Sequence, residues 1–237
     1  MNFPNRDHPS NREVRLDQIE RTYKIILVGD AGVGKTNIQS RIAGIEFSSD
    51  TKPTIGVDFS SRVVNVEGRI VRSQIWDTSG QERYMAMVKG YYRKADAAII
   101  VYDITRADTA VSVGKWAEEL YIHGGDSNPL ICLVGNKTDL NHLRGVLTED
   151  MEGAAKIGNY LFIETSAHDN TNIEFMFQQL MKALVHRDGD LNHPINDKEK
   201  RISDTSFSSG TTITTIDLKP TPAPKGSKKK SSNACAC

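Results

Sequence analysis

The chain has 237 residues, 38% of them hydrophobic, and its 30 Lys and Arg balance its 30 Asp and Glu. This length allows one domain of about 170 residues with a substantial core, plus additional chain at both ends. The balanced charge gives no indication of a nucleic-acid partner. No apolar run approaches the roughly 18 residues of a membrane-spanning helix.

Cysteine usage and the N-terminal sequence favour a reducing compartment. Cys132 falls in a predicted core strand, and the other two of the three cysteines are Cys235 and Cys237 at the very end. This distribution indicates no disulfide framework. The first residues lack the apolar region of a signal peptide, and Asn2 stands where myristoylation requires glycine. We therefore expect an intracellular enzyme or switch.

Apolar runs predict strands, with helices between most of them. The expected strands span residues 23–28, 58–66, 70–76, 97–102, 130–135 and 161–163. The second and third are joined by Glu67 and Gly68, a short turn that suits an antiparallel hairpin. The pattern predicts an α/β fold with a doubly wound, mostly parallel six-stranded sheet and one antiparallel edge strand.

Two helices are indicated by large residues at helical spacing, which we expect to be core. They are Val113, Trp116, Ala117 and Leu120 in one helix, and Phe175, Phe177, Leu180 and Leu184 in the other.

Three segments are expected along the chain: a flexible N-terminal extension over 1–21, a folded domain over 22–188, and a disordered tail over 189–237. The tail is rich in Ser, Thr, Pro, Gly and Lys and has too few large apolar residues to fold alone.

The segment from Gly29 to Thr36 matches the phosphate-loop pattern GxxxxGK[ST] and directly follows the first predicted strand. Glycines let such a loop turn consecutive N–H groups toward phosphate oxygens. Lys35 adds a charge near the β- and γ-phosphates, and the Thr36 hydroxyl is placed to bind Mg²⁺. Alone, the motif also fits an ordinary glycine turn. The predicted phosphate-binding residues are Gly29, Ala31, Gly32, Val33, Gly34, Lys35, Thr36 and, from a later segment, Gly80.

The sequence Asn-Lys-Thr-Asp at 136–139 lies just beyond the carboxyl end of another predicted strand, where open α/β sheets bind ligands. Guanine offers two adjacent donors, N1–H and the 2-amino group, and the Asp139 carboxylate can accept both. Adenine offers neither, a mismatch that costs roughly 10⁴-fold in such sites. Asn136 and Asp139 also suit turns, but beside a phosphate loop they predict GTP.

Residues between these motifs would make the chain a switch. Thr54 can bind Mg²⁺ through its hydroxyl and the γ-phosphate through its N–H. Asp77 adds a carboxylate for Mg²⁺, so the predicted metal set is Thr36, Thr54 and Asp77. Gln81 would orient the attacking water and is the predicted catalytic residue.

The order of these motifs resembles that of the Ras superfamily, and several segments are similar to its Rab family. The segments similar to Rab proteins are residues 54–59, 76–83, 91–93 and 101–105, and residues 165–167 complete the Ras-superfamily order. Residues 141–146 and 164–167 are most similar to the recycling-endosome and trans-Golgi branch. The resemblance extends over nearly all of the folded block.

The resemblance implies a P-loop NTPase small G domain over 22–188. It implies a membrane-anchored switch that binds and slowly hydrolyses GTP and regulates vesicle trafficking by recruiting effectors in its GTP form. The implied partners are GTP or GDP with Mg²⁺, an exchange factor, a GTPase-activating protein, a GDP-dissociation inhibitor or escort protein, and GTP-selective effectors. The implied location is the cytoplasmic face of endosomal or Golgi-derived membranes, with a cytosolic pool.

Individual positions inherit roles from the same resemblance. Phe47 would stack on guanine, the stem of Lys137 would cover its face, and backbone N–H groups around Ala167 would read its oxygen. The guanine-binding set is then Phe47, Asn136, Lys137, Asp139, Ser166 and Ala167. The implied effector surface is the aromatic triad Phe59, Trp76 and Tyr91.

The last three residues, Cys235-Ala236-Cys237, resemble the Cys-X-Cys ending on which both cysteines receive geranylgeranyl groups, and lysines at 225 and 228–230 precede it. Two lipid chains, or one beside a polybasic patch, give stable anchoring.

Two positions depart from the family pattern. Ala31 stands where serine or glycine is more usual, and Ser79 replaces the usual alanine before Gly80. They support an alternative function, a GTP-dependent scaffold with negligible hydrolysis. His168 also departs from the usual residue, and we expect it to be an exposed loop histidine. An RNA-associated GTPase is disfavoured, because no nucleic-acid module follows the folded block.

Overall fold

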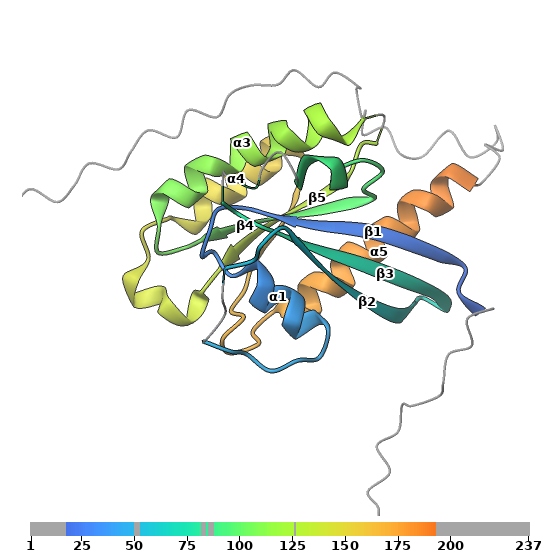
Figure 1. Cartoon of the computed structure of the whole chain (residues 1–237), viewed down its shortest axis with the longest axis horizontal. Coiled ribbons are helices and arrows are strands. Elements are labelled where there is room, and N and C mark those ends of the chain that lie inside the picture. Colours follow the sequence, from blue (N-terminus) through green and yellow to red (C-terminus); the bar gives the residue numbers. More distant parts are fainter. Residues whose placement is uncertain (1–17, 50–52, 82–83, 85–87, 126, 193–237) are drawn as a thin grey trace, which may run out of the picture.

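The computed structural model describes residues 18–49, 53–81, 84, 88–125 and 127–192. A six-stranded sheet in the order β2-β3-β1-β4-β5-β6 forms its centre (Figure 1). The strands are β1 (Arg21–Val28), β2 (Val57–Val66), β3 (Arg69–Thr78), β4 (Ala97–Asp103), β5 (Leu130–Asn136) and β6 (Leu161–Glu164). Only the edge strand β2 pairs antiparallel, with β3. The predicted fold is confirmed.

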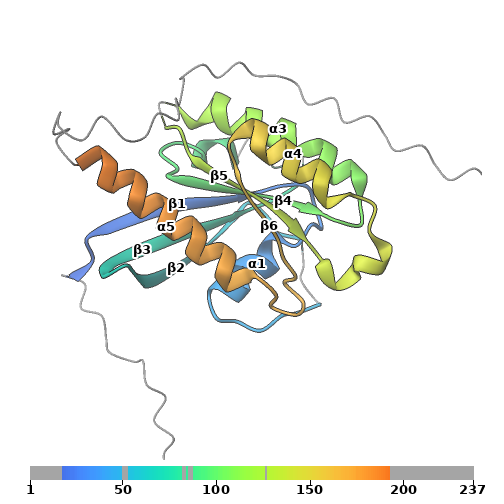
Figure 2. The ribbon, with the colours of Figure 1, turned by 180° about the vertical axis from the view of Figure 1, so that it is seen from behind.

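Helices cover both faces of the sheet. Figure 2 shows α5 (Ile173–Asn192) crossing one face, with α1 (Lys35–Ile42) beside it. The other face carries α3 (Ala107–Gly124) and α4 (Thr148–Gly158) (Figure 1). Among the described residues, no helix is both long and apolar enough to cross a membrane.

The apolar run of β1 is continuous because both faces of this strand are covered. Side chains alternate between the faces of a strand. Tyr23, Ile25 and Leu27 therefore pack in the core beneath α1 and α5, whereas Ile26 and Val28 pack in the core beneath α3 and α4. All five are fully buried. A strand covered on both faces needs apolar residues at every position.

The helix predictions hold with one exception. Val113, Trp116 and Leu120 of α3 are buried as expected. In α5, Phe177 is buried but Phe175 is 55% exposed, so its assignment to the core was wrong. Two residues rotate an α-helix by about 200°, which turns Phe175 away from the sheet.

The parallel strands bring their carboxyl ends to one edge of the sheet. The loop after β1 meets the loops after β3, β5 and β6 there. This crossing of connections is where doubly wound sheets bind ligands.

The ends of the folded block lie close together. The Asp188 carboxylate is buried near the end of α5, accepts a hydrogen bond from the Tyr23 hydroxyl at 2.8 Å and forms an ion pair with Arg21, also at 2.8 Å. Residues 1–17 and 193–237, which hold most of the predicted extension and tail, lie outside the described residues, as do Cys235 and Cys237.

Candidate functional site

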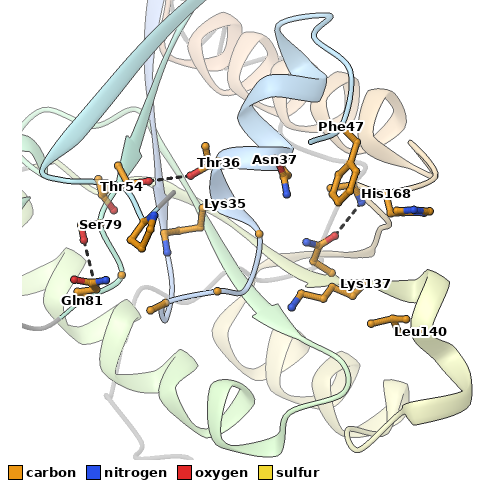
Figure 3. Close-up of a pocket in the computed structure, with 18 of the residues that line it drawn as sticks. Lys35, Thr36, Asn37, Phe47, Thr54, Ser79, Gln81, Lys137, Leu140 and His168 are labelled. Carbon is orange, nitrogen blue, oxygen red and sulfur yellow. Dashed lines mark hydrogen bonds between the residues drawn. The ribbon is translucent and has the colours of Figure 1, made fainter. Parts of the chain in front are cut away.

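A pocket of about 410 Å³ opens at the carboxyl edge of the sheet (Figure 3). Most of the predicted phosphate, guanine and metal residues line it together. Its lining is Ala31, Gly32, Gly34, Lys35, Thr36, Asn37, Phe47, Pro53, Thr54, Thr78, Ser79, Gly80, Gln81, Asn136, Lys137, Asp139, Leu140, Ala167 and His168. The other predicted residues of these sets are not part of the lining; they are Gly29, Val33, Asp77 and Ser166.

Lys35 places a buried cation at one end of the pocket. Lys35 is the first residue of α1, and its ammonium donates hydrogen bonds to the carbonyl oxygens of Gly29 at 2.8 Å and Asp30 at 2.9 Å. Burial lowers the pKa of Lys35 to about 8, although the charges of Asp77 and Asp30 oppose the shift. A cation that burial has partly stripped of water is suited to an anion such as phosphate.

Glycine is required around this lysine because the backbone segments approach closely. A Cβ on Gly29 (φ +141°) would overlap the Val101 carbonyl oxygen of β4. A Cβ on Gly80 would lie 2.5 Å from the Gly29 oxygen and 2.6 Å from the Ala31 nitrogen. The phosphate loop and the segment after β3 are thus held in contact by positions without side chains.

Oxygen atoms from three segments converge next to Lys35. The Thr36 hydroxyl donates to Asp77 Oδ2 at 2.6 Å, the Thr54 hydroxyl donates to the same atom at 3.1 Å, and the two hydroxyls are 2.9 Å apart. Within the described ranges, the buried Asp77 Oδ1 has no hydrogen-bond partner. Burial raises the pKa of Asp77, against the hydrogen bond from Thr36 and the charge of Lys35.

This cluster fits Mg²⁺, which prefers oxygen ligands and keeps several from water or phosphate. The part of the chain that the structure describes contains no group of three or more His, Cys, Asp or Glu placed to hold a metal. An ion held by one carboxylate and two hydroxyls would therefore need the other oxygens from a nucleotide and water.

Asn136 connects the phosphate loop to the opposite end of the pocket. Its amide donates to the Val33 carbonyl at 2.8 Å, and its oxygen accepts from the Ala167 N–H at 3.1 Å and the Thr165 hydroxyl at 3.3 Å. A Cβ on Gly34 (φ +100°) would overlap the Asn136 amide nitrogen.

Asp139 is held by the loop that follows β6. The Ser166 hydroxyl donates to Asp139 Oδ1 at 2.6 Å and accepts from the Asp169 N–H at 3.0 Å. The carboxylate is thereby fixed in the pocket wall, in the place where a base with two donors could meet it.

Lys137 is held from the side of β4. Its ammonium lies 2.7 Å from Asp103 Oδ2, and its backbone is left-handed (φ +75°). Burial alone would raise the pKa of Asp103, but hydrogen bonds from Lys137 and Thr105 bring it below its usual value. This pairing stretches the Lys137 stem along the pocket (Figure 3).

Phe47 and His168 form the outer wall of the same end (Figure 3), with ring centroids 5.0 Å apart and an interplanar angle of 71°. The His168 side chain is 60% exposed, as expected of a loop histidine, yet it also lines the pocket. Our sequence reasoning did not assign it there. It also missed Asn37, Pro53, Thr78 and Leu140, and the only signal for each was its position next to a predicted site residue.

The ion pair between Arg144 and Glu164 connects two loops at the base end of the pocket. Arg144 follows the 3-10 helix η4 (Thr138–Leu143), and its guanidinium donates to both oxygens of Glu164 at 2.7 and 2.8 Å. Glu164 is the last residue of β6, directly before the loop that holds Asp139. This bidentate pair therefore joins the two loops that surround the Asp139 side.

The three predicted effector residues lie together, outside the pocket lining. Phe59 of β2 and Trp76 of β3 have ring centroids 5.0 Å apart, and Trp76 lies 5.3 Å from Tyr91 of the 3-10 helix η3 (Lys89–Tyr91). Phe59 is 47% exposed. The chain thus presents an aromatic surface formed by three separate elements.

Comparisons with known proteins agree with this geometry. The Ras family model matches residues 24–186. Ras-related protein YPTC6 of Chlamydomonas reinhardtii is 48% identical over 170 residues, 72% of this chain and 78% of that protein. Ras-related protein RABA2b of Arabidopsis thaliana is 49% identical over 173 residues, 73% of this chain and 80% of that protein. RABA2d of the same plant is 50% identical over 164 residues, 69% and 75% of the two chains.

Both the family match and the identities cover most of the folded block. The chain therefore belongs to the Ras family, in its Rab group of GTP-binding, GTP-hydrolysing switches of vesicle traffic.

Proposed function

We propose that this chain is a membrane-anchored switch that binds GTP with Mg²⁺, hydrolyses it slowly and recruits effectors in its GTP form. The observation that carries the proposal is a single pocket with the buried Lys35 ammonium at one end and the braced Asp139 carboxylate at the other. A phosphate chain and a base with two adjacent donors fit these ends.

At the phosphate end, Lys35 and the glycine-lined backbone would hold the β- and γ-phosphates. Thr36, Thr54 and Asp77 would hold Mg²⁺, which when bound neutralises charge on the phosphate oxygens. Thr54 would respond to the γ-phosphate, since it comes from the segment before β2 rather than from the phosphate loop.

Gln81 lines the phosphate end, and its N–H donates to the Ser79 hydroxyl at 3.3 Å (Figure 3). We propose that the Gln81 side chain orients the attacking water. The described lining contains no arginine that could stabilise the transition state. By comparison with Ras, we expect unassisted turnover on the order of 10⁻⁴ to 10⁻³ per second, and an activating protein that inserts charge to accelerate it up to about 10⁵-fold.

We expect Gln81→Leu to slow single-turnover GTP hydrolysis by at least about tenfold while GTP affinity changes little, because the side chain orients water rather than binding the nucleotide. Gln178→Leu on the exposed face of α5 is the matched control and should hydrolyse GTP like the parent. An unchanged rate in Gln81→Leu would contradict the assigned role. A parent protein that binds GTP without measurable turnover would instead favour the scaffold function.

At the base end, Asp139 would accept the N1–H and 2-amino groups of guanine, and Phe47 and Lys137 would contact the ring. Ser166 would act indirectly, since its hydroxyl holds the carboxylate. Asn136 would also position the two loops, because its amide donates to the Val33 carbonyl and accepts from Thr165 and Ala167.

We expect Asp139→Asn to shift base preference from guanine toward xanthine, because an amide can donate to the carbonyl that xanthine has in place of the 2-amino group. Competition of GDP and XDP against a fluorescent nucleotide measures the change. Asp150→Asn, an exposed carboxylate of α4, controls for the loss of charge. A variant that still prefers GDP as strongly as the parent would refute the base assignment.

The aromatic triad Phe59, Trp76 and Tyr91 is our proposed effector surface, since interface energy concentrates in such aromatic anchors. Trp76 is half-buried between the other two rings. Phe59, at 47% exposure, is the member most open to a partner.

Phe59→Ala should weaken capture of GTP-selective partners by at least about tenfold, the effect of an anchor residue, with a small change in melting temperature. Phe175→Ala removes a similarly exposed phenylalanine from α5 and serves as the matched control. If Phe59→Ala reduces binding to the GDP and GTP forms equally, the triad is a structural cluster.

We further propose a domain over 22–188 followed by a tail that anchors the protein through Cys235 and Cys237 to the cytoplasmic face of endosomal or Golgi-derived membranes. An exchange factor, an activating protein, and a dissociation inhibitor or escort protein would then govern its cycle. The lysines at 225 and 228–230 support this, since each adds about 1 kcal/mol near an anionic membrane surface.

Replacing both cysteines, Cys235→Ser with Cys237→Ser, should make the protein wholly cytosolic while GTP binding and hydrolysis stay at parental values. Membrane pelleting of cell lysates measures the distribution. Ala234→Ser with Ala236→Ser alters the same segment but keeps both thiols, and it should still pellet. Pelleting of the double cysteine variant would overturn the anchor assignment.

A further inference from the structure

One arginine of α1 holds the loop at the base end of the pocket. Arg41 Nε donates to the Ala167 carbonyl oxygen and Arg41 Nη2 donates to the His168 carbonyl oxygen, each at 2.8 Å. A guanidinium is a rigid fork with several fixed donors, so two bonds from it fix the orientation of both acceptors. A lysine at this position could not hold two consecutive carbonyls in the same way.

These bonds also determine where the neighbouring N–H groups point. In a planar trans peptide, a carbonyl and the N–H of the next residue point in opposite directions. Because the Ala167 carbonyl faces Arg41, the His168 N–H faces away from it. Among the described residues, this N–H has no hydrogen-bond partner, and both Ala167 and His168 line the pocket.

The second hydrogen bond of Arg41, to His168, is linked through Asp169 and Ser166 to the Asp139 carboxylate. The His168 carbonyl faces Arg41, so the Asp169 N–H points the other way and donates to the Ser166 hydroxyl at 3.0 Å. That hydroxyl donates to Asp139 at 2.6 Å. Arg41 therefore fixes the orientation of the His168 N–H directly, whereas its link to Asp139 is indirect and passes through Asp169 and Ser166.

The same helix carries the phosphate-binding residues at its other end. Lys35 and Thr36 begin α1, and Arg41 lies six residues after Lys35, a rise of about 9 Å. A rigid helix thus connects both ends of the nucleotide site. A displacement of α1 would move the Lys35 ammonium and release the base-end loop together.

We propose that Arg41 is a positioning residue for base recognition, which orients the loop so that the His168 N–H meets the oxygen at position 6 of guanine. It does not touch the nucleotide. The proposal rests on the proposed function of the pocket, since it requires guanine at this end.

The test compares Arg41→Met and Arg41→Lys with the parent by competition against fluorescent GDP. The competitors are GDP, 6-thioguanosine diphosphate, which replaces only that oxygen by a weaker acceptor, and inosine diphosphate, which lacks only the 2-amino group. Arg62→Met is the matched control. The Arg62 side chain donates to the Ile42 carbonyl at the end of α1 and does not reach the loop.

In Arg41→Met we expect the preference for GDP over the thio analogue to fall about threefold to tenfold, the usual value of one neutral hydrogen bond. The preference over inosine diphosphate should change less than about twofold, because Asp139 keeps its direct bond to Ser166. Arg41→Lys should give an intermediate loss, and Arg62→Met should match the parent.

Equal changes in both preferences, or none, would overturn the proposal, because they would mean general loosening or no role. If Arg41→Met does not fold, hydrogen exchange of the His168 amide in the GDP complex of Arg41→Lys decides: faster exchange than in the parent supports the proposal, and equal exchange refutes it. A parent protein that shows no preference for GDP over inosine diphosphate would instead refute the guanine assignment.

Discussion

The nucleotide pocket depends on the buried side chain of Asn136. Its amide engages the phosphate loop through Val33 and the base-end loop through Ala167 and Thr165. Because a side-chain amide both donates and accepts, one residue satisfies backbone groups on two loops that would otherwise be buried without partners. Gly34 is required beside it, since a Cβ there would overlap the amide nitrogen. The distance between the two ends of the pocket is thereby fixed before any ligand arrives.

Burial sets the electrostatics of the phosphate end. It lowers the pKa of Lys35 to about 8 and raises the pKa of Asp77, so both groups are shifted toward their neutral forms. A phosphate beside Lys35 would favour its protonated form, and a cation beside Asp77 would favour its ionised form. Binding of nucleotide with metal should therefore be accompanied by proton uptake at Lys35 near pH 8 and above, and by proton release at Asp77 under acidic conditions.

The sequence was sufficient for those features that local patterns determine. The continuous apolar runs required strands covered on both faces, and the phosphate-loop and Asn-Lys-Thr-Asp motifs placed Lys35 and Asp139 before any contact was known. Arg41 and the Arg144–Glu164 pair could not be found this way. Arg41 meets Ala167 across 126 positions of sequence, and nothing in the local pattern around a polar helix residue indicates such a partner. The assignment of Phe175 to the core failed for a different reason: hydrophobicity alone does not say which side of a helix faces the sheet.

Strand β3 connects the pocket with the aromatic surface. Asp77 and Trp76 are adjacent in β3, and in the antiparallel register Asp77 lies opposite Asp58 while Trp76 lies opposite Phe59. Since neighbouring residues of a strand face opposite sides, the fully buried Asp77 contacts Thr36 and Thr54, whereas Trp76 packs with Phe59 and Tyr91.

A displacement of Thr54, which lies just before β2, would affect both the Asp77 carboxylate and the aromatic surface. Thr54 bonds the Asp77 carboxylate, and three residues later its segment enters β2, which carries Phe59. The γ-phosphate that Thr54 is proposed to sense is therefore linked to the effector surface by one strand pair rather than by a long relay. Strand β2 lies at one edge of the described sheet, next to β3, so it can move with less disturbance of the core than a central strand.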